Sequence, residues 1–368
     1  MAGCWARNRR PARPPGDQRA TCALSFGFRY LSGPHSPELV LTTSPAPVRP
    51  IGLAEIRQAR DRIASTIVRT PLFRLELGPD LPDIRLKLEI LQPINTYKLR
   101  GAANAVAMLS DSERSRGVWT ISAGNAGQGV AYAARRANVP CTVVAIETAP
   151  ASKLDRMKAL GARVIPVPYE VAWETLETRT FPGVEGAFVH PFDDHDFIAG
   201  HGTIGLEILE DAPDTVAIIA AIGGGGLITG VGSAIKALRP EIKIWGVEPE
   251  TGAPAALSAK MGSPQRFPDW KPSFVDGAGG QSVFPRMFER MRPIVDGHIV
   301  VSLDETKRAM RMMAEKVRII TEGAGALALA AALTGKAGCG PIVAIVSGGN
   351  IDLQKFAEIV GSGATAHQ

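Results

Sequence analysis

From residue 52 onward, short apolar runs of strand length alternate with longer segments of helical period. This alternation is typical of βαβ units, whose parallel strands are covered by helices on both faces. There are too many runs for one small sheet, so we predict an α/β fold of two lobes, each with a mostly parallel sheet flanked by helices. The expected strands are Leu86–Leu91, Val118–Ser122, Thr142–Ile146, Val164–Val167, Ala187–His190, Val216–Ile222, Ile242–Val247, Ile299–Ser302 and Ile342–Val346. The expected helices include Gly52–Ser65, Gln128–Asn138, Ser152–Leu160, Leu227–Leu238, Glu305–Val317 and Ala324–Thr334.

Composition and charge exclude several classes of protein. The chain has 368 residues, of which 45% are hydrophobic and 21% charged. No apolar stretch approaches the roughly 20 residues that a membrane helix requires, so we expect no membrane partner. The net charge of +5 lies entirely within residues 1–50, because residues 51–368 carry 34 basic and 34 acidic side chains. A nucleic-acid-binding protein would concentrate basic residues on a folded face, so we expect no nucleic-acid partner either.

The cysteines indicate a reducing environment. Their spacing contains no C-x-x-C motif, which argues against a zinc cluster or a disulfide framework and favours a cytoplasmic protein. The four are Cys4, Cys22, Cys141 and Cys339.

Residues 1–48 form a tail rich in Pro, Gly, Ser and Arg, with no apolar period long enough to bury a face. Disorder, or a segment that the working protein does not need, is the favoured interpretation. An organelle transit peptide is the alternative, because the tail is rich in arginine and poor in acids.

Ligands of open parallel sheets bind beyond the carboxyl ends of the strands, so the turns from strand to helix hold the candidate sites. One such turn contains four consecutive glycines, Gly223–Gly226. Glycines let backbone N–H groups converge, and the following helix adds partial positive charge, so the turn predicts a phosphate cradle. It lacks both the P-loop ending and the dinucleotide-binding spacing. A turn that binds nothing is the alternative for this motif taken alone.

A second turn, Ser122–Gly129, also follows an expected strand and opens a helix. It offers backbone N–H groups, the Ser122 hydroxyl and the side-chain amides of Asn125 and Gln128, but no formal charge. Such groups favour a carboxylate over a second phosphate. A capped helix start with glycines for close packing is the alternative.

Lys98 stands in the segment Asn95–Ala102, just before an alanine-rich helix. A single lysine at a helix start is usually a solvated charge. A lysine, a phosphate cradle and a carboxylate cradle are together what a pyridoxal phosphate enzyme acting on an amino acid needs.

The motifs resemble those of the serine/threonine dehydratase family, within the fold-type-II pyridoxal-phosphate-dependent enzymes, which have a tryptophan synthase β-like fold. Five motifs fall in the family's order, and the resemblance covers residues 52–361. They read Thr96-Tyr97-Lys98-Leu99-Arg100-Gly101-Ala102, Ser122 to Gly129, Gly223 to Leu227, Glu322-Gly323-Ala324-Gly325-Ala326 and Ser347-Gly348-Gly349-Asn350.

The resemblance implies a role for each candidate residue. Lys98 would hold pyridoxal 5'-phosphate as a Schiff base and remove the substrate Cα proton. The cofactor phosphate would bind to Gly223, Gly224, Gly225 and Gly226. The substrate carboxylate and the cofactor edge would be surrounded by Ser122, Gly124, Asn125, Ala126 and Gln128. Asn125 would also reach the 3-oxygen of the cofactor ring, Phe192 would lie near the cofactor, and Ser347 would hydrogen-bond the pyridine nitrogen. A serine hydroxyl is too weak an acid to keep that nitrogen protonated, which favours prompt elimination over transamination.

The sequence departs from the family pattern at several positions. Ala126 replaces the usual histidine, and His201 stands where a glutamine is common; we expect His201 to be a polar residue lining a helix. Ala123 stands where serine racemases need a serine as acid/base, which argues against racemase activity. Glu248 is followed by Pro249 as in relatives that bind a cation, but Pro254 replaces the second acidic ligand, so we expect no metal site.

The resemblance implies β-elimination from L-threonine or L-serine to give 2-oxobutanoate or pyruvate and ammonia. It also implies a large cofactor-binding domain, residues 49–107 plus 196–361, an inserted α/β domain, residues 108–195, a short tail, residues 362–368, and a homodimer. One alternative is a dehydratase for another β-hydroxy amino acid, such as phenylserine or 3-hydroxyaspartate. A nucleotide-binding oxidoreductase and a catalytically silent cofactor-binding protein are weaker alternatives.

Overall fold

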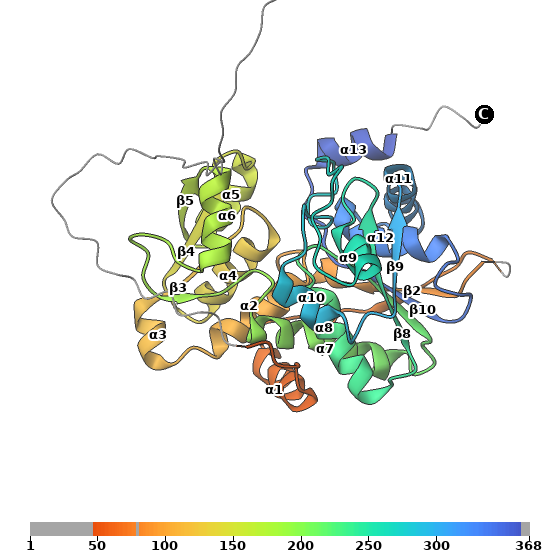
Figure 1. Cartoon of the computed structure of the whole chain (residues 1–368), viewed down its shortest axis with the longest axis horizontal. Coiled ribbons are helices and arrows are strands. Elements are labelled where there is room, and N and C mark those ends of the chain that lie inside the picture. The colour runs from red at the N-terminus through yellow and green to blue at the C-terminus, as the bar shows by residue number, and fades with distance from the viewer. Residues whose placement is uncertain (1–46, 79–80, 362–368) are drawn as a thin grey trace, which may run out of the picture. The chain divides into compact units, whose positions relative to one another are not determined.

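The computed structural model describes residues 47–78 and 81–361, which fall within one compact unit, residues 45–368. The expectations for residues 1–46 and 362–368 lie outside this range. The strands are β1 Leu72–Leu75, β2 Ile84–Leu88, β3 Val118–Ile121, β4 Cys141–Ile146, β5 Arg163–Val167, β6 Ala187–Phe188, β7 Ala217–Ala221, β8 Lys243–Pro249, β9 Gly297–Val301 and β10 Ile342–Val346 (Figure 1). The α-helices are α1 Leu53–Ile63, α2 Lys98–Ala107, α3 Asp111–Arg116, α4 Asn125–Arg136, α5 Ala151–Ala159, α6 Tyr169–Thr178, α7 His195–Asp211, α8 Gly226–Leu238, α9 Pro254–Met261, α10 Pro285–Met291, α11 Leu303–Met312, α12 Gly323–Leu333 and α13 Leu353–Gly361.

The larger sheet has six strands in the order β1-β2-β10-β7-β8-β9. All neighbouring pairs are parallel except β1 with β2, which is antiparallel. Alternate residues of the central strands face opposite sides, as the two-residue period of a strand requires. Ile219 and Ala344 pack in the core that includes α11, α12 and α13, whereas Ile218 and Val343 pack in the core that includes α1, α7 and α8. Both faces are therefore covered by helices.

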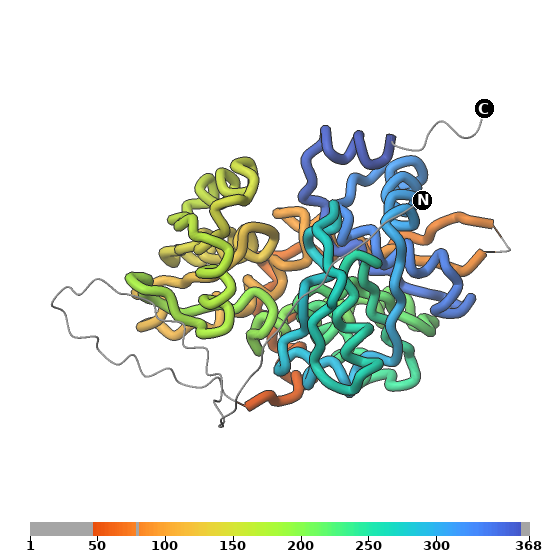
Figure 2. The backbone as a smooth tube through the Cα atoms, turned by 45° about the horizontal axis from the view of Figure 1, so that its top comes forward, coloured from red at the N-terminus to blue at the C-terminus, as the bar shows by residue number. Residues whose placement is uncertain are grey.

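The smaller sheet has four parallel strands in the order β5-β4-β3-β6. Val143 of β4 packs with Ala131 of α4 and Met157 of α5, while its neighbour Val144 packs with Ala172 of α6 on the other face. Figure 2 traces the chain from the orange segment of the larger sheet through the yellow smaller sheet and back through the green α7. The α/β fold with two mostly parallel sheets is thus confirmed, while the boundaries of the two domains stay a prediction.

Helix α7 contains three glycines because it packs unusually close to its neighbours. A Cβ atom at Gly200 would lie 2.4 Å from the backbone oxygen of Arg100 in α2. On the facing helix α8, a Cβ atom at Gly230 would lie 2.4 Å from the backbone oxygen of Ile198. Glycine in these helices therefore reflects contact between backbones rather than a loop.

Two expected elements differ from the structure. The run Leu86–Leu91 contains only the end of β2, because the chain turns into the short 3-10 helix η1, Glu89–Leu91. The expected helix Glu305–Val317 begins earlier as α11 and ends in a π-helical turn, η2, Met313–Val317, where Arg318 takes a φ of 61°. Within residues 47–78 and 81–361, no helix is both long and apolar enough to cross a bilayer.

Candidate active site

The expected site residues gather because their turns all follow the carboxyl ends of parallel strands. In the larger sheet, Leu88 of β2 pairs with Val346 at the end of β10, so the segments after these two strands leave the sheet side by side. A bridge between Thr96 and Gly348 and a hydrogen bond from the Tyr97 N–H to the Ser347 oxygen (3.0 Å) join these segments. The start of α2 is therefore fixed beside the end of β10.

A pocket of about 470 Å³ opens at this edge and is lined from both sheets. It brings together most of the residues singled out in the sequence. These are Lys98, Ser122, Gly124, Asn125, Ala126, Phe192, Gly224 and Ser347. Four others, Gly223, Gly225, Gly226 and Gln128, adjoin these residues in the chain but do not themselves line the pocket, and their roles stay predictions.

Lys98 is the first residue of α2, and its side chain reaches the pocket wall. The amine Nζ donates a hydrogen bond to the backbone oxygen of Pro191 (2.6 Å) and lies 5.2 and 5.3 Å from the ring centres of Tyr97 and Phe197. Its surroundings are mostly apolar, and burial lowers the pKa of Lys98 to about 7. The residue is partly accessible, but only at the pocket, so a large fraction of the amine is uncharged at neutral pH. An uncharged amine is both a nucleophile toward carbonyl groups and a base.

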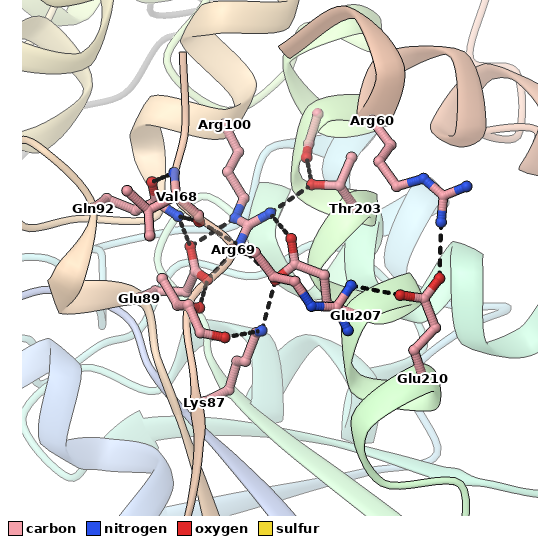
Figure 3. Close-up of polar contacts among 12 residues, drawn as sticks. Arg60, Val68, Arg69, Lys87, Glu89, Gln92, Arg100, Thr203, Glu207 and Glu210 are labelled. Atoms are coloured by element: carbon pink, nitrogen blue, oxygen red, sulfur yellow. Dashed lines mark hydrogen bonds and ion pairs between the residues drawn. The ribbon is translucent and has the colours of Figure 1, made fainter. Parts of the chain in front are cut away.

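A buried ionic network holds the helix that carries Lys98 (Figure 3). Arg100 donates to Glu89 after β2 (2.8 Å) and to Glu207 of α7 (2.6 Å). Lys87 of β2 donates to the same Glu207 (2.6 Å). The two cations and two carboxylates balance, and although burial alone would raise the pKa of Glu89, the charge of Arg100 keeps it lowered. The network therefore ties α2 to the larger sheet and to α7 at fixed distances.

The glycine turn leads from β7 into α8 with its backbone close to Phe192. A Cβ atom at Gly224 would lie 2.1 Å from Cγ of Phe192, and Gly225 takes a φ of +85°, which L side chains rarely adopt. Among the described residues, no side chain caps the first turn of α8. Its N–H groups and the helix dipole are thus available to an anion, which suits a phosphate group.

The asparagine turn leads from β3 into α4, whose first residue is Asn125. The Gly124 N–H donates to Oγ of Ser122 (3.1 Å), so the serine side chain folds back on its own turn. Gln128 lies one helical turn further on and is buried, and its Nε2 has no hydrogen-bond partner among the described residues. The turn still presents the start of a helix to the pocket, as a carboxylate site requires.

The aromatic wall of the pocket is fixed by His190. Its Nδ1 accepts hydrogen bonds from the N–H groups of Phe192 (3.3 Å) and Asp193 (3.0 Å), so the ring proton sits on Nε2. Burial lowers the pKa of His190 to about 3, which keeps the ring neutral. The Phe192 ring packs edge-on against His190, with ring centres 4.4 Å apart.

Glu322 is a pocket residue to which the sequence motifs assigned no role. It precedes α12 and is buried, and its Oε1 accepts a hydrogen bond from Nδ2 of Asn125 (2.8 Å). Burial, together with the negative charge of Asp276, raises the pKa of Glu322 to about 8. The signal in the sequence was its place in the fourth motif, but the pairing with Asn125 spans 197 residues and was not visible there.

Two residues that the sequence left in doubt now have a position. His201 lies inside α7, fully buried against the rings of Tyr97 and Phe197, and does not line the pocket. Glu248 accepts hydrogen bonds from the N–H groups of Ala255 (3.0 Å) and Ala256 (2.8 Å), so both carboxyl oxygens cap the start of α9.

The fold and the pocket define a class of protein: a two-sheet α/β enzyme with an uncharged lysine amine and an anion-binding helix start in one cleft. Residues 63–348 match the family model described as "Pyridoxal-phosphate dependent enzyme". The chain belongs to this family. It is 39% identical to an L-threonine ammonia-lyase of Thermotoga maritima, over 85% of this chain and 79% of that protein.

Solved structures show the same fold. Maize serine racemase superposes with a TM-score of 0.78 at 32% identity, covering 85% of this chain and 98% of the other. A threonine deaminase whose source is given as "T.th." has a TM-score of 0.74 at 35% identity, covering 82% of this chain and 99% of the other. These neighbours are fold-type-II enzymes, as the resemblance in the sequence implied.

The residues present fit pyridoxal phosphate. Lys98 offers an uncharged amine to an aldehyde, and the turn at Gly224 leaves no room for a Cβ atom beside Phe192. Ser347, at the end of β10, lines the same pocket as Lys98 and Gly224. The cofactor therefore has a covalent anchor and an anion site within one cleft.

Proposed function

We propose that this enzyme is an ammonia-lyase that converts L-threonine to 2-oxobutanoate and ammonia, and L-serine to pyruvate and ammonia. The observation that carries the proposal is the position and charge of Lys98, whose amine faces the cleft and is largely uncharged at neutral pH. The likeness to the Thermotoga L-threonine ammonia-lyase and to a solved threonine deaminase supports the choice of reaction.

The residues divide the chemistry as follows. Bound pyridoxal phosphate supplies an electron-withdrawing ring that makes the Cα–H bond of an amino acid acidic. Lys98 takes the Cα proton at Nζ, and the carbonyl oxygen of Pro191 steadies that amine. The turn Gly223–Gly226 holds the cofactor phosphate, and the asparagine turn holds the substrate carboxylate with its N–H groups. Loss of the β-hydroxyl as water and hydrolysis of the product then give the keto acid and ammonia.

A racemase is the second candidate, because maize serine racemase is among the structural neighbours. Reversing the configuration at Cα requires a proton donor on the face opposite Lys98. Ala123 lines the pocket where a serine racemase would need a serine, and its methyl group has no proton to exchange. Elimination is therefore favoured over racemisation.

We also propose that the enzyme acts in the cytoplasm as a homodimer. The cysteine pattern supports the compartment, and the dimer rests on analogy with the family. Cell fractionation and light scattering test the two statements separately.

The test of the function is incubation of the purified holoenzyme with L-threonine and L-serine, followed by detection of keto acid and ammonia. The panel includes phenylserine and 3-hydroxyaspartate, and Lys98→Ala serves as the inactive control. We expect the highest kcat/KM for threonine or serine. A higher value for another β-hydroxy amino acid would change the assigned substrate, and keto acid formation by Lys98→Ala would refute the role of Lys98.

A further inference from the structure

Glu322 lies where the two sheets meet at the pocket. Its own backbone precedes α12 of the larger sheet, whereas Asn125, its hydrogen-bond partner, begins α4 of the smaller sheet. The side chain is buried and lines the pocket beside Ser347. A carboxyl group in such a place requires an explanation, because burying it without compensation is costly.

The side-chain amide of Asn125 is held at both ends. Its Nδ2 donates to Oε1 of Glu322 (2.8 Å), and its Oδ1 accepts from Nδ2 of Asn350 (2.8 Å). Asn350 is in turn fixed by a second hydrogen bond, from the same Nδ2 to the backbone oxygen of Ile94 (2.9 Å). An amide with an acceptor at its nitrogen and a donor at its oxygen has only one orientation that satisfies both contacts. The second N–H of Asn125 is left for the pocket.

The charges around Glu322 keep it in the acid form at neutral pH. Burial and the neighbouring carboxylate Asp276 raise its pKa to about 8, against the opposing effects of the Asn125 hydrogen bond and the positive charge of Lys153. Tyr97, which is also buried, faces Glu322 across the pocket. Further charged groups line the outer space that Glu322 also borders. These are Arg156, Asp352 and Lys355.

We propose that Glu322 is a positioning residue that fixes the Asn125 amide toward the cofactor and does so as an uncharged carboxylic acid. This inference rests on the proposed function, in which Asn125 contacts the cofactor. An uncharged acid accepts the hydrogen bond from Asn125 without placing a negative charge beside a ring that must withdraw electrons. Ionised Glu322 would still hold Asn125, but it would oppose the build-up of negative charge on the substrate.

A double-mutant cycle tests the positioning role. The variants are Glu322→Ala, Asn125→Ala and the pair, and the readouts are the dissociation constant of pyridoxal phosphate and the kcat and KM for L-threonine. We expect Glu322→Ala to weaken cofactor binding by roughly tenfold, the factor for one net hydrogen bond. In the Asn125→Ala background the same change should have an effect within about twofold, because the partner is already gone. A full tenfold effect in that background overturns the proposal.

Glu322→Gln is the conservative variant, because it keeps the acceptor oxygen and cannot ionise. We expect it to bind the cofactor like the unmodified enzyme at pH 7, whereas a loss as large as that of Glu322→Ala overturns the proposal. The unmodified enzyme should lose kcat as the pH rises through about 8, and Glu322→Gln should not. An alkaline decline that persists in Glu322→Gln overturns the uncharged role.

Glu248→Gln is the matched control. Glu248 is also a buried glutamate, and burial raises its pKa to about 7, but it caps α9 and does not line the pocket. Its variant should keep both the cofactor affinity and the alkaline decline. The cofactor affinities of the cycle decide the role of Glu322 even if the holoenzyme forms no keto acid from threonine or serine, an outcome that would refute only the proposed function.

Discussion

The buried amine of Lys98 should make the cofactor-free protein less stable than a variant without it. Burial lowers the pKa of Lys98 from 10.5 to about 7. Between these values the unfolded chain binds more protons than the folded one, so the stability of the unmodified protein rises with pH. At about 1.4 kcal/mol per pKa unit, the amine costs about 4 kcal/mol at pH 7 and about 2 kcal/mol at pH 9.

The perturbation is Lys98→Met, which keeps the length of the side chain and removes the amine. It also removes the hydrogen bond to Pro191, which contributes about 1 kcal/mol at either pH. We therefore expect the variant to be more stable by about 3 kcal/mol at pH 7 and by about 1 kcal/mol at pH 9. Water in the pocket solvates part of the ammonium group, so these figures are upper values.

The assay is urea unfolding of the cofactor-free proteins at both pH values, with m-values compared to check that the unfolded states match. Lys87→Met is the contrasting variant, because Lys87 is equally buried but is paired with Glu207. Breaking that pair should destabilise the protein by about 3 kcal/mol or more. A Lys98→Met variant no more stable than the unmodified protein, or an advantage that does not shrink with pH, would refute the reasoning.

Three further changes test the pocket. Gly224→Ala places a Cβ atom 2.1 Å from Cγ of Phe192, so we expect the turn to shift and the affinity for pyridoxal phosphate to fall by more than about tenfold; unchanged affinity in a cofactor titration would show that this turn is not the phosphate cradle. Ala123→Ser adds a hydroxyl to the pocket wall and should increase D-serine formation from L-serine, measured by chiral chromatography, whereas no D-serine would mean that the face opposite Lys98 lies elsewhere. Ser347→Asp should lower elimination and raise side reactions such as transamination, and an unchanged ratio of products would count against a role for Ser347 at the ring nitrogen.

The sequence predicted the parts of the fold that depend on local pattern. The central strands β7 and β10 and the helices α8 and α12 lie within a residue or so of their expected bounds, because their apolar runs are buried on both faces of a sheet. Strand β1 was missed because it is an edge strand of four residues with two exposed side chains. Helix α7 was not among the expected helices, since its glycines signal a loop until the close packing with α2 and α8 is known.

The same limit applies to the pocket. Turns such as Ser122–Gly124 and Gly223–Gly226 were visible because each is contiguous in the chain and has a composition with a physical meaning. The clamp on Asn125 was not, because Glu322 and Asn350 come from distant parts of the sequence. What a side chain does at this pocket is decided by partners from the other sheet.

The two buried lysines of this region show why residue type alone cannot assign a role. Lys87 and Lys98 lie within eleven positions of each other, and both are removed from bulk water. Lys87 meets Glu207 and the backbone oxygen of Thr70, so it makes an ion pair and ties β2 to α7. Lys98 meets only a carbonyl oxygen and aromatic rings among the described residues, so burial removes its charge instead. The ionic network around Arg100 holds α2 rigidly enough for that second environment to persist, which makes a stable charged cluster the support for a reactive uncharged amine two residues away.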